Sequence, residues 1–280
     1  MPTININISG LVFEIKINNY TLFKNIEKDL LLFTTHRKPD YAIEIKDVSF
    51  SDFKKKFPVI GDDTKPVVLK EQNSVFNFIC SDSAVTFDSK NCKSVITTVG
   101  LDAHGISHTL LKDTINLRLM MNKSIILHSC GIATSEGVFV FSGPSGSGKS
   151  TIAHNSNGQT VLNDENIALC CSDKTIFAYG TPWFGTAQKS ANIKEKIKAI
   201  FFIKISEEFK CAKLSNAMSF FMLFNNTFIP FRYENFLGLQ DEICSGIIKS
   251  VPCYKLNFPY PMSNFWGYLT KQKKKELMLC

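Results

Sequence analysis

The stretch "GVFVFSGPSGSGKSTIAHN", residues 137–155, carries the most specific pattern of the chain. Its spacing G-x-x-x-x-G-K-S is made by Gly143, Gly148, Lys149 and Ser150. The apolar run at 138–141 predicts a buried strand, and "NSNG" at 155–158 predicts a short helix, because these residues are poor helix formers. A strand, a glycine-rich loop and a helix in this order are typical of a phosphate-binding loop.

Such a loop binds phosphate because successive backbone N–H groups point into one concavity and the next helix presents its N-terminus there. Lys149 is predicted to reach the β- and γ-phosphates as an exposed cation, and the Ser150 hydroxyl to ligate Mg²⁺. The alternative is a plain turn rich in glycine and serine. The predicted ATP-binding residues are Gly143, Ser145, Gly146, Ser147, Gly148, Lys149, Ser150 and Thr151.

Two neighbouring carboxylates follow the loop in "TVLNDENIAL", residues 160–169. Mg²⁺ needs an acidic ligand besides Ser150, and an acceptor hydroxyl needs a base, so Asp164 and Glu165 are candidates for these tasks. Neighbours on a strand point to opposite faces, but at a strand end or a bulge both can face one cleft. The alternative is a solvent-exposed acidic pair in a turn.

A histidine, His128, lies inside the apolar run "IILHSCGIA" ahead of the loop. The run predicts a strand, where a histidine is unexpected. Two interpretations stay open from the residues alone: a hydrogen-bonded core histidine, or a catalytic one.

Composition indicates a globular protein, with 280 residues of which 44% are apolar and 20% charged. No apolar run approaches the roughly 20 residues that span a bilayer. The first ten residues, "MPTININISG", lack the basic and apolar segments of a secretory signal. We therefore expect a cytoplasmic protein that does not enter a membrane.

Cysteine spacing and charge exclude two further classes of function. The nine cysteines form no C-x-x-C pair and no zinc-ligand spacing with histidine, which favours reduced thiols in the core. The formal charge of +7 comes almost entirely from lysine, with a dense run only at 271–275. Nucleic-acid readers tend to use arginine, so we expect no nucleic-acid partner.

The order of predicted elements indicates an α/β protein with a mixed sheet, because strands and helices follow one another without strict βαβ alternation. Residues 1–105 form a smaller β-rich region with one helix at 24–33, and residues 106–280 form the domain that contains the glycine-rich loop. Later helices are predicted at 108–122, 215–225, 234–249 and 264–278.

Four segments together, "ILHSCGIA", "GVFVFSGPSGSGKST", "VLNDENIAL" and "GTPWFG", resemble the catalytic domain of HPr kinase/phosphorylase and the wider group of HPr-kinase-like serine kinases. The resemblance is specific over residues 127–185 and thinner to residue 268. It implies a phosphoenolpyruvate-carboxykinase-like P-loop fold. It also places His128 in the active site, gives Asp164 to the metal, and makes Glu165 the base for the acceptor hydroxyl.

Two departures from that family narrow the prediction. The family usually has Asp-Asp where this chain has Asp164 and Glu165, and its arginine- and glycine-containing signature is missing after the pair. The chain therefore looks closer to kinases of free serine or of ribosomal precursor peptides, as in lasso-peptide pathways, than to HPr kinase proper.

The sequence predicts an ATP- and Mg²⁺-dependent kinase that phosphorylates a hydroxyl, serine above all, of a peptide, protein or small molecule, with a homo-oligomer left open. One rival is an ATP-binding regulator or assembly factor that uses the loop as a conformational switch. Another is a structural relative that has kept the fold without catalysis. The second carboxylate, Glu165, separates kinase from switch, because a switch needs the metal ligand alone.

Overall fold

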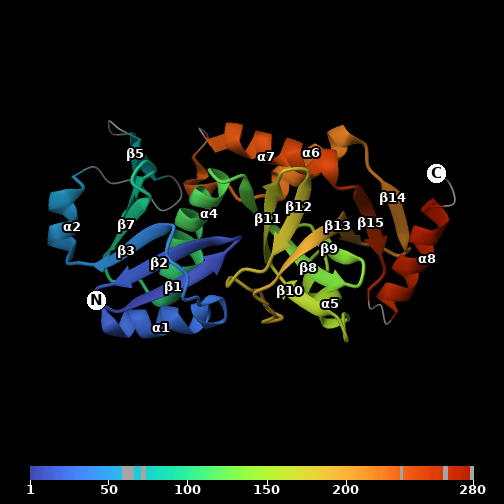
Figure 1. The fold of residues 1–280 in the computed structure, drawn as a ribbon, viewed down its shortest axis with the longest axis horizontal. Coiled ribbons are helices and arrows are strands. Elements are labelled where there is room, and N and C mark those ends of the chain that lie inside the picture. The colour runs from blue at the N-terminus through green and yellow to red at the C-terminus, as the bar shows by residue number, and fades with distance from the viewer. Residues whose placement is uncertain (59–65, 71–73, 234–235, 261–263, 278–280) are drawn as a thin grey trace. The chain divides into compact units, whose positions relative to one another are not determined.

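The structure, a computed structural model, describes residues 1–58, 66–70, 74–233, 236–260 and 264–277 (Figure 1). The chain forms two compact units, Met1–Asn122 with Ile229–Gly238, and Lys123–Phe228 with Leu239–Cys280. The division falls after residue 122 rather than near residue 105. The division lies later because the predicted helix at 108–122 packs within the first unit. There the Phe231 amide donates to Asp113 Oδ2 at 3.0 Å.

The first unit is built on a mixed sheet of seven strands in the order β1-β2-β3-β7-β6-β5-β4. Its strands are β1 Thr3–Ile8, β2 Leu11–Ile17, β3 Tyr41–Asp47, β4 Val67–Lys70, β5 Val75–Ile79, β6 Ser83–Asp88 and β7 Lys93–Thr98. Alternating isoleucines explain the first strand, since Ile4, Ile6 and Ile8 are all buried on one face. The β2–β3 and β3–β7 pairs are parallel and the remaining pairs are antiparallel.

Helical segments accompany this sheet: α1 Tyr20–Leu30, α2 Phe50–Lys56, α3 Ala103–Gly105, a π-helical segment Ile106–Leu111, α4 Lys112–Met120, and the 3-10 turns Leu31–Phe33 and Pro230–Arg232. Side-chain caps fix where two of them begin. The Leu22 amide donates to Asn19 Oδ1 at the start of α1, and the Asp52 amide donates to Ser49 Oγ at the start of α2.

The second unit contains a mixed sheet of eight strands: β8 Ser124–Thr134, β9 Gly137–Ser142, β10 Thr160–Asn163, β11 Asn166–Ser172, β12 Thr175–Tyr179, β13 Lys194–Ile205, β14 Lys210–Lys213 and β15 Cys253–Phe258. Strand β9 pairs with both β8 and β13, and β15 follows on the far side of β13. The pairs β9–β13 and β13–β15 are parallel, so the carboxyl ends of these three strands meet at one edge. The α/β class with mixed sheets is confirmed.

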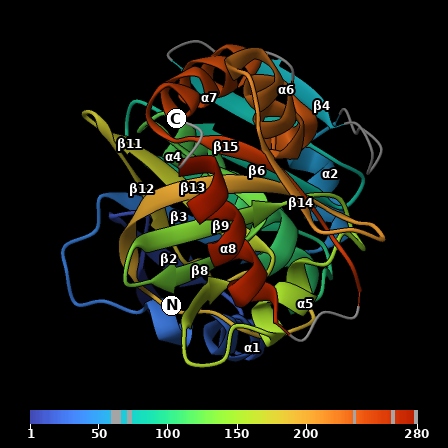
Figure 2. The same ribbon diagram turned by 90° about the vertical axis from the view of Figure 1, so that its right-hand side faces the viewer.

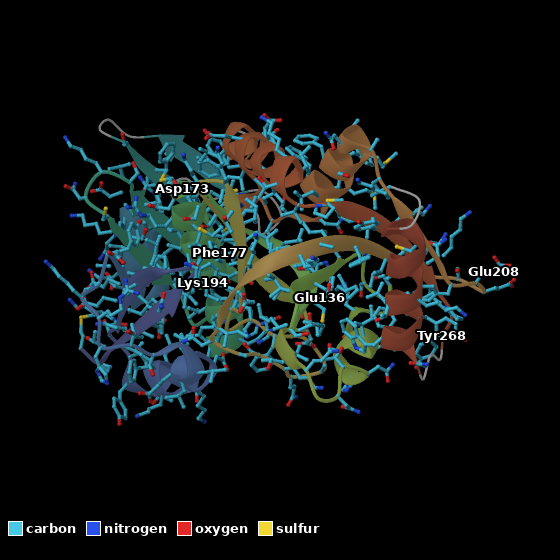
Figure 3. The ribbon with its side chains drawn as sticks, turned by 45° about the vertical axis from the view of Figure 1, so that its right-hand side comes forward. Glu136, Asp173, Phe177, Lys194, Glu208 and Tyr268 are labelled. Atoms are coloured by element: carbon cyan, nitrogen blue, oxygen red, sulfur yellow. The ribbon has the colours of Figure 1, made fainter. Side chains whose placement is uncertain are left out.

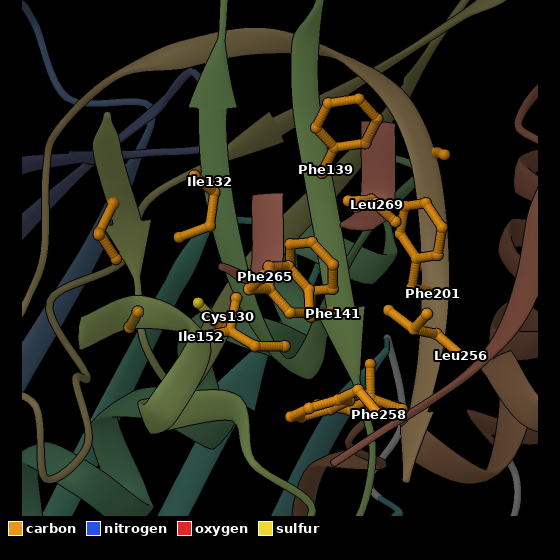
Figure 4. Packing of buried hydrophobic residues seen from close by; sticks show 14 residues of the cluster. Cys130, Ile132, Phe139, Phe141, Ile152, Phe201, Leu256, Phe258, Phe265 and Leu269 are labelled. Carbon is orange, nitrogen blue, oxygen red and sulfur yellow. The ribbon is translucent and has the colours of Figure 1, made fainter. Parts of the chain in front are cut away.

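The helices of the second unit are α5 Lys149–His154, α6 Asn216–Asn226, α8 Phe265–Leu277 and, from residue 239 on, α7 Leu237–Ser250. In Figure 2, α8 runs across β9 and β13. The contacts are aromatic, with Phe265 5.5 Å from Phe141 between ring centroids, and Phe141 stacked on Phe201 at 5.3 Å. Figure 4 shows this cluster, to which α5 adds Ile152. Burial of such large side chains anchors the short helix directly beneath the glycine-rich loop.

Three parts of the sequence predictions lie outside the described residues. They are the first residues of the helix predicted at 234–249, the last residue of the helix predicted at 264–278, and Cys280. The side chains of the lysine run beyond residue 271 are likewise outside what the structure describes. None of the eight described cysteines is joined to another in a disulfide bond. No helix in the described parts of the chain has the length and apolar character needed to cross a membrane.

Candidate active site

The glycine-rich loop leaves the carboxyl end of β9 and is shaped by its glycines. Gly146 and Gly148 have φ angles of 77° and 102°, which side chains with a Cβ rarely adopt. Gly143 has no room for a side chain, since a Cβ there would lie 2.7 Å from Ser147 Oγ and 2.9 Å from Ile203 O. Helix α5 has only six residues, so the loop amides carry more of any anion binding than the helix dipole does.

Lys149 folds back onto the loop that precedes it. Its ammonium donates to Gly143 O at 2.8 Å and to Pro144 O at 3.1 Å, and the residue is 7% exposed. The prediction of an exposed cation was therefore wrong, because the loop wraps around the side chain. Burial lowers the pKa of Lys149, and the negative charge of Glu165 partly opposes that shift.

Both carboxylates lie in the tight turn between β10 and β11, which Asn163 holds in place. Its fully buried side-chain oxygen, Oδ1, accepts from the Glu165 and Asn166 amides, each at 2.7 Å. A register shift in β10 against β8 falls between Val161 and Asn163. A strand end next to a bulge thus lets neighbouring carboxylates face one cleft.

A second loop, residues 180–187, reaches over the acidic pair. Asp164 is buried, and its two oxygens accept from the amides of Gly185 at 2.9 Å and Ala187 at 2.8 Å. Between them, Thr186 places its Oγ1 3.3 Å from Ser150 Oγ. This loop therefore ties the acidic turn to the start of α5 and brings a second hydroxyl beside Ser150.

The loop and the acidic turn line one cavity of about 420 Å³. Its walls are formed by His128, Ser145, Gly146, Gly148, Lys149, Ser150, Thr151, Asp164, Glu165, Gly185, Thr186, Ile205 and Tyr260. Of the residues predicted from the sequence, only Gly143 and Ser147 are absent from these walls. Ser147 lines a neighbouring cavity that shares Ser145, Gly146 and Ile205 with this one, and Gly143 packs against Ser147 and Ile203.

His128 stands on the cavity wall, half-buried on β8, with its ring 6.0 Å from that of Phe228. Its backbone carbonyl accepts from Ser142 Oγ at 2.9 Å, which joins β8 to the end of β9 where the loop begins. Of the two interpretations from the sequence, the cavity position favours a place in the site.

Four residues of the cavity were missed by the sequence analysis: Gly185, Thr186, Ile205 and Tyr260. The segment "GTPWFG" that contains Gly185 is rich in turn residues and predicts a loop, but nothing in it indicates that this loop meets the acidic pair. Ile205 and Tyr260 carried no signal, since their position depends on how distant strands pair.

Oxygen atoms dominate the part of the cavity that could hold a metal. Asp164 supplies a carboxylate, and Ser150 and Thr186 supply hydroxyls 3.3 Å apart. Mg²⁺ prefers such hard oxygen ligands and is usually held by one or two protein groups together with substrate phosphates. In the described residues no group of three or more His, Cys, Asp and Glu could hold a metal ion. The residues present thus fit Mg²⁺ bound with a phosphate ligand.

Comparison with known proteins gives only distant structural likenesses. No family model matches the chain, and no curated protein matches it. Among solved structures, the HPr(Ser) kinase/phosphatase from Coxiella burnetii is similar, with 9% sequence identity over 55% of this chain and 99% of that one, and a TM-score of 0.32. A likeness this distant assigns neither a family nor an activity, so the site is interpreted from its own geometry.

Proposed function

We propose that this protein is an ATP- and Mg²⁺-dependent kinase that transfers the γ-phosphoryl group to a hydroxyl, serine above all, of a peptide, protein or small molecule. One observation carries the proposal: Lys149 and Ser150 of the glycine-rich loop line the same cavity as Asp164 and Glu165. A phosphate-binding loop positions the donor, and a carboxylate beside it can accept the proton of an acceptor hydroxyl.

Each side chain has a distinct task in this proposal. The loop amides and Lys149 bind the phosphates, while Ser150 and Asp164 hold Mg²⁺, which supplies neutralisation of phosphate charge when bound. Asp164 is held by two backbone amides and is thereby oriented. Glu165 is half-buried in the turn and accepts the proton of the acceptor hydroxyl. His128 lines the same cavity and assists Glu165.

The transfer balances with these groups alone. A bond forms between the acceptor oxygen and the γ-phosphorus. The bond from that phosphorus to the bridging oxygen breaks, and ADP leaves with the electron pair. The hydroxyl proton passes to Glu165. General-base help of this kind contributes typically about 10²- to 10⁴-fold to the rate.

The rival function, an ATP-driven switch, needs the metal ligand but no second carboxylate. Glu165 shares the cavity with Lys149, and its charge opposes the lowering of the lysine pKa. A carboxylate this close to the loop favours catalysis over switching.

The test compares wild type with three variants, using ATP labelled at the γ-phosphate, free serine and serine-containing peptides, with phosphoserine read by mass spectrometry. Glu165→Gln should bind Mg·ATP normally and lose transfer. Asp164→Asn should lose transfer and also weaken Mg·ATP binding. Asparagine has one acceptor oxygen for the amides of Gly185 and Ala187, so the side chain that holds Mg²⁺ loses its charge and part of its orientation. Glu208→Gln, the same change on an exposed loop (Figure 3), should match wild type.

The outcomes separate the candidates. Phosphoserine that vanishes in Glu165→Gln supports the kinase and its base. Phosphoserine that survives in Glu165→Gln keeps the kinase and removes Glu165 as its base. Label released only as free phosphate with every acceptor, at a rate that Glu165→Gln leaves unchanged, supports the switch.

A further inference from the structure

Two large apolar side chains stand exposed on the wall of the catalytic cavity. Ile205 is 38% exposed and Tyr260 is 62% exposed, and both line the cavity together with Gly148 and Thr151. Exposure of a tyrosine ring to this degree leaves much of its apolar surface in water. Neither residue has a task in the phosphoryl transfer itself.

Their place in the sheet sets them apart from the acidic pair. Strand β9, which leads into the loop, lies between β8 on one side and β13 on the other. His128 is on β8. Asn166, which directly follows the acidic pair, lies opposite His128 in the neighbouring strand β11. Ile205 is the last residue of β13, and Tyr260 lies just beyond β15, the next strand outward. The cavity therefore has a charged end and an apolar end, with the loop between them.

The loop packs directly against the apolar end. A Cβ on Gly148 would lie 3.6 Å from Ile205 Cγ1 and only 2.6 Å from Phe258 Cζ, at the close of β15. The backbone that receives phosphate is thus in contact with the strand ends that carry Ile205 and Tyr260. In open parallel sheets, ligands bind beyond the carboxyl ends of the strands. Ile205 and Tyr260 lie at these ends of β13 and β15, where a ligand is expected.

Building on the proposed function, we propose that Tyr260 and Ile205 form the binding site for the adenine base of ATP. A nucleotide whose terminal phosphate faces Asp164 and Glu165 extends its base away from them, toward the apolar end. Adenine is flat, uncharged and apolar on its faces, so it stacks on a tyrosine ring and covers an isoleucine. The base buries the two side chains that are otherwise exposed.

A second cavity, of about 470 Å³, is the competing place for the base. It shares Ser145, Gly146 and Ile205 with the first cavity, and its other walls include Ser147, Met222, Lys204 and Lys255. Most of its other walls are apolar, but it lacks Tyr260 and it lacks Ser150 and Thr151 at the start of α5. The site at Tyr260 is favoured because an aromatic ring there lines the same cavity as Ser150 and Thr151.

The experiment separates base from phosphate by titrating two ligands, Mg·ATP and Mg·tripolyphosphate, by calorimetry. The two share the triphosphate, and only ATP has a base. Tyr260→Ala should weaken ATP binding about tenfold and leave tripolyphosphate binding unchanged, since stacking on an aromatic ring is lost. Tyr260→Phe keeps the ring and should bind both ligands as wild type does. Ile205→Ala should act in the same direction with a smaller effect, but Ile205 lines both cavities, so Tyr260→Ala is the variant that distinguishes them.

Two control variants sharpen the result. Tyr268→Ala removes an exposed tyrosine of α8 that is absent from the cavity walls (Figure 3), and should bind both ligands normally. Met222→Ala removes an apolar wall of the second cavity. Selective loss of ATP binding in Met222→Ala, or equal loss of both ligands in Tyr260→Ala, overturns the inference. So does unchanged ATP binding in Tyr260→Ala, while wild type that binds neither ligand overturns the proposed function as well.

Discussion

Gly185 lies against the carboxylate of Glu165, and a Cβ at residue 185 would be 2.6 Å from Glu165 Oε2 and 3.0 Å from Asp164 Oδ2. The amide of the same glycine donates to Asp164 Oδ1. One residue thus positions one carboxylate by a hydrogen bond and leaves room for the other. The backbone can approach this closely only because no side chain intervenes.

Gly185→Ala should therefore displace the acidic pair with little effect on overall folding. We expect transfer to fall by about 10²-fold, because a displacement near 1 Å at reacting groups can cost this much. Tripolyphosphate binding should change less, since the loop at 143–148 is untouched. Rate and affinity measurements check this.

The matched control is Gly246→Ala in α7, where a Cβ would meet only Cys171 Sγ at 3.6 Å, an ordinary contact. That change replaces a helical glycine and should raise stability by up to about 1 kcal/mol without altering transfer. If Gly185→Ala transfers phosphate as fast as Gly246→Ala does, Gly185 has no positioning role.

Asn163→Ala tests whether the acidic turn is held from below. The substitution leaves the Glu165 and Asn166 amides without their acceptor and removes the bond that Asn163 Nδ2 donates to Thr181 O at 2.8 Å. Unsatisfied buried groups cost about 1–3 kcal/mol each, so thermal unfolding should begin several degrees lower, and transfer should fall while tripolyphosphate still binds.

Asn225→Ala is the control for this change, because its side chain makes a single bond to Phe221 O on an exposed helix surface. Its melting temperature should stay close to that of wild type. Equal melting temperatures for the two alanine variants would show that the turn does not depend on Asn163.

Local patterns account for what the sequence could predict. The strand before the loop and the short helix after it each depend on residues within a few positions of one another. The turn that carries Asp164 and Glu165 was only the alternative to a strand end or bulge, and the structure places it between β10 and β11. Helix α2, by contrast, was missed, because "FSDFKKK" has only one buried apolar residue, Phe53. Strand β7 was missed as well, since "KSVITT" buries serine and threonine as well as isoleucine and so lacks a clear alternation.

The rest of the site depends on contacts between distant segments. Tyr260 reaches the cavity because β15 pairs in parallel with β13, with Ile205 opposite Phe258. Thr186 meets Ser150 because Asp164 holds the amides on either side of it. Sequence periodicity indicates that a strand exists but not which strand lies beside it, so these positions needed the structure.

Buried thiols predict how stability depends on alkaline pH. Burial raises the pKa of Cys171 and Cys253 to about 11 and that of Cys244 to about 12, from an ordinary 9.0. A raised pKa means that the unfolded chain ionises first, so stability is complete below pH 9 and is lost as pH rises toward 11 or 12. Melting temperatures between pH 8 and 11 measure the loss.

Cys253→Ala should make that loss shallower, because one titrating group is removed. Reductant should leave the melting temperature at neutral pH unchanged, since none of the described cysteines is joined to another in a disulfide bond. A fall of several degrees on reduction would reveal a disulfide and contradict the assignment of these residues as thiols.

Lys149→Met tests the buried ammonium that the loop encloses. Methionine is unbranched and of similar length, so it fills the space of Lys149 while removing the charge and the bonds to Gly143 O and Pro144 O. If this ammonium binds phosphate, the affinities for Mg·ATP and Mg·tripolyphosphate should both fall about 10- to 100-fold, the value of a hydrogen bond to a charged group. This differs from Tyr260→Ala, which should affect ATP alone.

The same variant has a signature in the pH dependence of stability without ligand. Burial lowers the pKa of Lys149 from 10.5, so the folded protein releases this proton at lower pH than the unfolded chain does. Between the two values the unfolded chain holds more protons, and wild type should therefore gain stability relative to Lys149→Met as pH rises toward 10.5. Thiols away from the loop titrate equally in both proteins and cancel in this difference. Cys130 does not cancel, because its charge and that of Lys149 influence each other's pKa, so the comparison is made in the Cys130→Ala background. Unchanged affinity for tripolyphosphate in Lys149→Met would show that the lysine only braces the loop.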